Sequence, residues 1–123
     1  MPFTPDTILL PQWQDLVIYQ NKDADLILTL TDPTTISQTN STGLPYNLTG
    51  LTVNLIRKAS RDSADATGKT YVCTIQGAPT NGVAAVTLPA ADNAVSGVDW
   101  YRVDLVGSET KAVKFGRLNV FAV

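Results

Sequence analysis

Histidine is absent from the 123 residues, and cysteine occurs once, as Cys73. The first absence removes the commonest general base and the commonest metal ligand, and a single thiol allows neither an intrachain disulfide nor a cysteine-based zinc site. Cys73 lies in an apolar stretch, where we expect it to be a small buried residue. Carboxylates remain, but Asp99 and Asp104 are five apart and so fall on opposite faces of a strand. The sequence therefore predicts no metal, no cofactor and no enzyme.

Charge is also scarce. The chain has nine Lys and Arg residues and eleven Asp and Glu residues, which gives a net charge of −2, and the basic residues do not cluster. Nucleic-acid affinity is dominated by phosphate neutralisation, so we expect no nucleic-acid partner. No apolar run approaches ~18 residues, and the N-terminus lacks the basic and apolar regions of a signal peptide. We expect no membrane partner and synthesis in a cytoplasm.

The residues that are present alternate with a period of two. In 83–88, Ala84, Val86 and Leu88 fall on one face, and in 100–105 Tyr101, Val103 and Leu105 do the same. Asn81-Gly82 predicts a two-residue type I′ hairpin turn before the first of these strands, and Pro89 ends it. Tyr101 fits two roles, a tyrosine corner or a plain core tyrosine.

Further strands are expected at 16–19, 25–31, 52–58, 69–76 and 111–123, with long polar loops at 32–46 and 59–68. Gly116, in the middle of the last strand, indicates a bulge or bend. About seven strands with short turns and no helical period predict an all-β sandwich of one domain.

Residues 1–12 are expected to form an extended arm and 13–123 the sandwich, because three prolines in the first eleven residues disfavour a helix. Phe3, Ile8, Leu9 and Leu10 are too apolar for a solvated tail. The arm either folds over its own sandwich or lies on a neighbouring subunit. Together with Trp13, these four are our candidate partner-binding residues.

Four segments, 48–57, 81–89, 100–105 and 115–120, resemble the immunoglobulin-like domain at the N-terminus of bacteriophage baseplate upper proteins and similar small tail or head proteins. The resemblance covers roughly the last hundred residues. It implies an immunoglobulin-like sandwich that serves as a non-enzymatic building block of the virion. The implied partners are other virion subunits, tail or capsid, and copies of itself, assembled in the bacterial host cytoplasm.

Within this family the expected role is a tail or baseplate component, with capsid-surface decoration as the alternative. The chain ends at Val123, where a baseplate protein continues, which favours a stand-alone virion protein. A different hypothesis is a carbohydrate- or cell-surface-binding module, since sugars stack on exposed aromatic rings. Trp13, Tyr46 and Trp100 are the candidates for that role.

Overall fold

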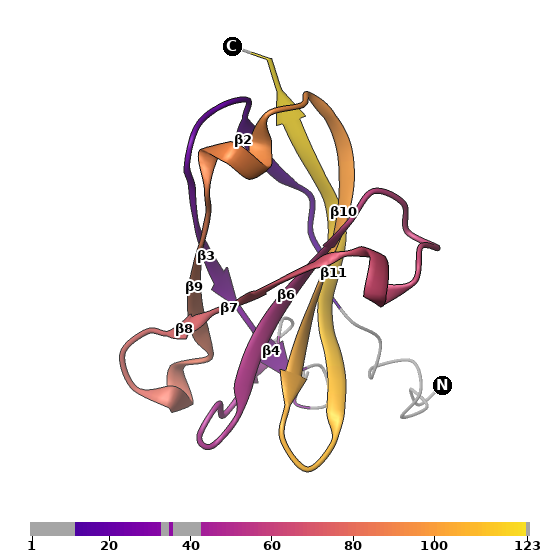
Figure 1. Ribbon diagram of the computed structural model, residues 1–123. Coiled ribbons are helices and arrows are strands. Elements are labelled where there is room, and N and C mark those ends of the chain that lie inside the picture. The colour runs from indigo at the N-terminus through magenta and orange to yellow at the C-terminus, as the bar shows by residue number, and fades with distance from the viewer. Residues whose placement is uncertain (1–11, 33–34, 36–42, 123) are drawn as a thin grey trace, which may run out of the picture.

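The computed structural model, which describes residues 12–32, 35 and 43–122, has two main β-sheets packed face to face and a small two-stranded sheet (Figure 1). The fold is an immunoglobulin-like β-sandwich, as the sequence predicts. Its larger sheet has β1 (Gln12–Trp13) and β2 (Leu16–Tyr19) at one edge, followed by β11 (Thr110–Phe121), β10 (Gly97–Val106), β6 (Thr52–Lys58) and β7 (Lys69–Val72). The smaller sheet runs β3 (Ala24–Thr29), β9 (Val83–Leu88), β8 (Thr74–Ile75).

Short elements complete the described chain. Strands β4 (Thr31–Asp32) and β5 (Leu44–Pro45) pair with each other, and single 3₁₀ turns occur at η2 (Asp65–Thr67), η3 (Pro79–Asn81) and η4 (Ala90–Asn93). The described residues thus form eleven strands rather than about seven, because several strands are only two residues long. No helix in this part of the chain has the length and hydrophobicity to cross a bilayer.

The edge strands β1 and β2 run parallel to β11, whereas β10 and β11 form a long antiparallel hairpin. Strand β6 lies between β10 and β7. The three central strands β11, β10 and β6 are thus extended by one strand, β7, on one side and by the edge strands β1 and β2 on the other.

The core lies between the sheets and is built by alternation. Ala84, Val86 and Leu88 of β9 point inward, as do Tyr101 and Val103 of β10, which confirms the faces read from the sequence. The fully buried leucines include Leu28, Leu30, Leu48, Leu55, Leu88 and Leu118. Truncating one such leucine to alanine costs about 2–5 kcal/mol.

The hairpin prediction at Asn81-Gly82 is wrong. Asn81 ends the 3₁₀ turn η3, and only Gly82 has a positive φ, of 67°. A type I′ turn requires both residues to be left-handed. The connection is instead residues 76–82, closed by the Gln76 N–H donating to the Val83 carbonyl. Gly82 is needed because a Cβ there would approach the Leu30 carbonyl oxygen to 2.6 Å.

The expected irregularity at Gly116 is also wrong in position. Gly116 pairs regularly with Tyr101, and the register shift between β10 and β11 falls at Val103/Asp104. Gly116 is required for a different reason: an added Cβ would overlap the Gln14 carbonyl, which crosses it. Tyr101 donates its hydroxyl to that same carbonyl oxygen. Its partner, Gln14, lies between β1 and β2, 87 residues away in the sequence, so Tyr101 is a core tyrosine and not a tyrosine corner.

The predicted strand 69–76 divides at Cys73 into β7 and β8, which belong to different sheets. The chain therefore passes from the larger sheet to the smaller one at this residue. Cys73 is buried, as expected, and desolvation raises the pKa of its thiol to about 11.

Candidate docking surface

Seven large apolar side chains share the outer face of the larger sheet, along β1, β2, β11 and β10. We call this set the apolar strip: Trp13, Val17, Tyr19, Val98, Trp100, Phe115 and Phe121. Alternate residues of a strand point to the same face, and Leu16, Ile18, Leu118 and Val120 point into the core. Their neighbours therefore point outward.

Strand register places the members of the strip beside one another. Trp13 pairs with Phe115, and Tyr19 pairs with Phe121. Val98 continues the strip onto β10. The exposed fractions of Trp13, Val17, Tyr19, Val98 and Phe121 lie between 42% and 54%. Scattered single apolar residues are normal on a surface, but several large exposed apolar side chains gathered on one face indicate an interaction site.

One end of the strip is aromatic. The Trp13 ring meets Phe115 edge-on with centroids 4.9 Å apart, and it meets Trp100 at 5.9 Å. The Arg61 guanidinium lies over Trp13 and Phe115, 5.9 and 5.6 Å from the ring centroids. Aromatic pairs such as Trp13 with Phe115 contribute about 0.5–1.5 kcal/mol to stability beyond the burial of their surface. Trp13 is thus held in place although it is exposed, and Trp100 is a half-buried residue of the outer face rather than of the core.

An ion pair occupies the middle of the strip. Arg117 donates from Nη2 to Asp15 Oδ2 at 2.8 Å, and its backbone N–H donates to Asp15 Oδ1 at 3.1 Å. The side-chain hydrogen bond from Arg117 is the main reason that the pKa of Asp15 is below its ordinary value. The pair lies between the aromatic end and the exposed pair Tyr19 and Phe121.

A charged rim borders the strip on the β6 side. Arg102 donates to both carboxylate oxygens of Asp104 and to both of Asp65, and Lys58 also donates to Asp65. The hydrogen bond from Arg102, followed by that from Lys58, lowers the pKa of Asp65 to about 2. These bonds hold the loop 59–68 against the sheet. An apolar centre with a charged rim is the usual composition of a protein interface.

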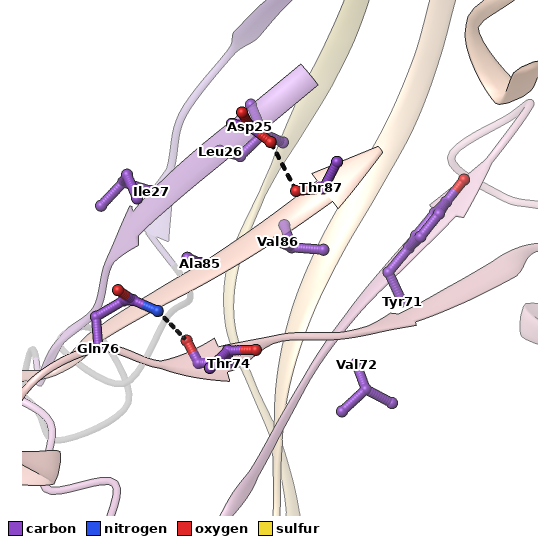
Figure 2. Close-up of a pocket in the computed structure, with 10 residues that line it drawn as sticks. All are labelled: Asp25, Leu26, Ile27, Tyr71, Val72, Thr74, Gln76, Ala85, Val86 and Thr87. Carbon is purple, nitrogen blue, oxygen red and sulfur yellow. Dashed lines mark hydrogen bonds between the residues drawn. The ribbon is translucent and has the colours of Figure 1, made fainter. Parts of the chain in front are cut away.

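A second candidate is the groove between β9 and β7, with a volume of about 500 Å³ (Figure 2). It exists because β8 pairs only with Ala84 and Ala85, so the second half of β9 is uncovered on that side. Thr87 donates to Asp25 at 2.6 Å on its wall. The lining residues hold one carboxylate, Asp25, and one phenol, Tyr71, and include no Cys, Lys or Arg.

A third cluster closes one end of the sandwich. The nearly buried Arg57 donates to Asp99 at 2.8 Å and to Asn93 at 2.7 Å. Nearby, Lys69 and Tyr71 both donate to Asp92. Every charge here has a partner, so the cluster fastens the η4 segment to the sheets.

Among the candidates named from the sequence, Trp13 lies in the strip, and Phe3, Ile8, Leu9 and Leu10 lie outside the described residues. Pairing of the edge strand begins at Gln12. The proposed sugar-stacking residues do not all meet: Trp13 and Trp100 are in contact, whereas Tyr46 is near Leu30, whose carbonyl accepts its N–H.

Sequence reasoning did not assign Val17, Tyr19, Val98, Phe115 or Phe121 to a binding surface. The available signal was the second apolar face of two strands, 16–19 and 111–123, which have apolar side chains on both sides. A strand with two apolar faces is expected where both faces are covered.

No group of three or more Cys, Asp or Glu arranged to hold a metal ion occurs in residues 12–32, 35 and 43–122. Asp99 contacts Arg57 between the sheets and Asp104 contacts Arg102 on the outer face, so the two carboxylates lie on opposite faces, as their spacing predicts.

Comparisons with known proteins found no matching family model and no matching curated protein. Solved structures with a similar chain path include Tim-1, at 13% identity and a TM-score of 0.35, with 92% of this chain and 96% of that chain covered. Another is a family 123 glycoside hydrolase from Clostridium perfringens, at 7% identity and a TM-score of 0.36. That match covers 91% of this chain but 23% of the hydrolase. Likenesses this distant carry no inference about activity, ligand or partner.

Proposed function

We propose that this chain is a structural protein of a bacteriophage virion, a non-enzymatic β-sandwich that docks on other virion subunits in the tail or baseplate. The observation that supports docking is the apolar strip. Its five most exposed side chains present roughly 500 Å² of apolar surface, since aromatic side chains bury about 150–250 Å² each and half of each is exposed. That is near the upper end of what a monomer shows.

The virion assignment rests on the family resemblance of the segments 48–57, 81–89, 100–105 and 115–120. Decoration of the capsid surface is the alternative location. In either location the chain acts as a rigid unit, because its charged side chains are largely paired with one another and its core is made of fully buried leucines. The arm expected from the sequence at residues 1–12 is proposed as a second contact, and all of it except Gln12 lies outside the described residues.

The test is particle composition. The chain is expected in purified particles, in the tail fraction after heads and tails are separated, as detected by an antibody. Phe121→Asp should reduce incorporation because it places a charge in the strip. Ile27→Asp is the matched control, since Ile27 is 64% exposed on the smaller sheet. Detection only in the head fraction would move the proposal to capsid decoration, and absence from particles would refute it.

Removing residues 1–10 tests the arm separately. The truncated chain should keep the thermal transition of the sandwich but fail to enter particles. Incorporation at normal occupancy would show that the arm makes no essential contact.

A carbohydrate-binding module is the second candidate, and a specific observation favours it. A pocket of about 170 Å³ lies beside Trp100 and Phe115, with Arg61, Lys58 and Arg102 on its walls. Saccharide-dependent quenching of Trp100 fluorescence, measured in a Trp13→Phe background, would support this candidate. Unchanged fluorescence across a glycan panel would exclude it.

A further inference from the structure

We infer that the apolar strip binds the same strip of a second copy, around a twofold axis that runs parallel to the strands between β2 and β11. This inference rests on the proposed function, because it names the partner of the same docking surface. The two larger sheets would then face each other, about 10 Å apart.

The arrangement of the strip is self-complementary about this axis. Two aromatic pairs link the edge strands to β11. In each pair one side chain is on β1 or β2 and the other is on β11: Trp13 lies beside Phe115, and Tyr19 lies beside Phe121. A twofold rotation about a line between the β1–β2 edge and β11 places the β1 or β2 member of each pair opposite the β11 member of the same pair in the second copy. Each Tyr19 therefore faces the Phe121 of the second copy, and each Trp13 faces its Phe115. In such an interface residue i contacts j and j contacts i.

The ion pair between Asp15 and Arg117 favours this axis over a twofold axis perpendicular to the strands. Asp15 and Arg117 straddle the same line, so the rotation places each Asp15 opposite the second copy's Arg117 and forms a ring of four alternating charges. A twofold axis perpendicular to the strands at this level would place Asp15 opposite Asp15 and Arg117 opposite Arg117. Like charges brought together at an interface disfavour that arrangement.

The area is sufficient for a weak, concentration-dependent dimer. Roughly 500 Å² of apolar surface per copy gives about 1,000 Å² in total, which is the lower limit for a specific interface. Asn119 and the loop 59–68 lie beside the strip and add polar area to this interface.

The first experiment is sedimentation equilibrium of the full chain over a wide concentration range. The wild type should show a monomer–dimer equilibrium. Phe121→Asp should weaken association at least about tenfold, since a tenfold change needs only about 1.4 kcal/mol. Ile27→Asp, on the exposed face of the smaller sheet, should associate as the wild type does. A wild type that stays monomeric throughout, or equal weakening by both variants, would overturn the inference.

The second experiment tests the axis by charge exchange. Asp15→Arg alone gathers four arginines at the centre of the dimer and Arg117→Asp alone gathers four aspartates, so each variant should lose self-association. The double variant Asp15→Arg/Arg117→Asp again sets each arginine opposite an aspartate and should self-associate as the wild type does. In a mixed dimer of wild type and double variant, the strand-parallel axis places arginine opposite arginine and aspartate opposite aspartate, so mixed dimers should be rarer than the statistical share. Mixed dimers at or above that share would show that the axis is wrong.

Failure of this inference is distinguishable from failure of the proposed function. If the wild type is monomeric in solution but Phe121→Asp still prevents incorporation into particles, the strip docks on a different virion subunit. The proposed function would then stand and the self-association would be refuted.

Discussion

Gly116→Ala is the substitution that most directly tests how the edge strand is held. An alanine Cβ at this position would overlap the carbonyl oxygen of Gln14 and approach its carbonyl carbon to 2.7 Å. Both atoms are backbone, so the clash cannot be relieved by a side-chain rotation. We expect Gln14 to be displaced and the pairing of β1 with β11 to be lost.

The cost follows from the bonds that Gln14 makes. Its N–H donates to the Phe115 carbonyl at 2.9 Å, and its own carbonyl accepts the Tyr101 hydroxyl. Its side-chain oxygen accepts a 2.6 Å hydrogen bond from Lys114, whose side chain is almost completely buried. Each such bond contributes about 1 kcal/mol, and more where a buried group is left without a partner. We expect a loss of about 2–4 kcal/mol, or about 8–16 °C in Tm.

Urea denaturation gives the free energy, and near-ultraviolet circular dichroism reports the contact between Trp13 and Trp100. Gly50→Ala is the control. Gly50 has a positive φ, of 73°, which Gly116 does not, and no atom lies within 4 Å of a Cβ added at Gly50. The control should lose about 1–2 kcal/mol from backbone strain and keep the aromatic signal. If Gly116→Ala is no less stable than the control and keeps the same signal, the explanation of this glycine is wrong.

Three further predictions concern charged and titratable groups. Arg57→Met should lower the free energy of unfolding by about 2–3 kcal/mol, because Asp99 is left partly buried without its partner; a loss below about 1 kcal/mol in urea denaturation would contradict this. NMR titration should find the pKa of Asp65 at about 2, and Arg102→Gln should move it up towards 3.8; because the folded-state pKa is lowered, the stabilisation from this carboxylate is present above pH 3.8 and is lost as pH falls through about 2. Iodoacetamide at pH 8 should modify Cys73 at least about 100-fold more slowly in the native protein than in urea, since thiolate is the reactive form and its pKa is raised to about 11; equal rates would show that the thiol is accessible.

The parts of the fold that were predictable from the sequence depend on neighbours along one strand. Alternation in β9 and β10 assigns Val86 and Val103 to the core without any knowledge of the partner strands. The same period places Asp99 and Asp104 on opposite faces. A period of two depends only on residues within one strand, so the faces that it predicts are the ones found in the folded chain.

The parts that were not predictable depend on groups far away in the sequence. Gly116 looks like a bulge residue until Gln14, near the other end of the chain, is known to cross it. The apolar strip is of the same kind, since its continuity requires the parallel register that sets Tyr19 beside Phe121. At Asn81 the local signal was outweighed by Pro79, which begins a 3₁₀ turn and lengthens the connection.

The parallel pairing of β2 with β11 also determines how the sandwich responds to force. The chain enters β2 at Leu16 and leaves β11 at Phe121, at opposite ends of the same pair of strands (Figure 1). Tension applied to the two termini pulls these strands along their length in opposite directions, so the hydrogen bonds between them are strained simultaneously rather than one after another. A particle component tethered through both termini would therefore resist stretching until the hydrogen bonds between β2 and β11 break.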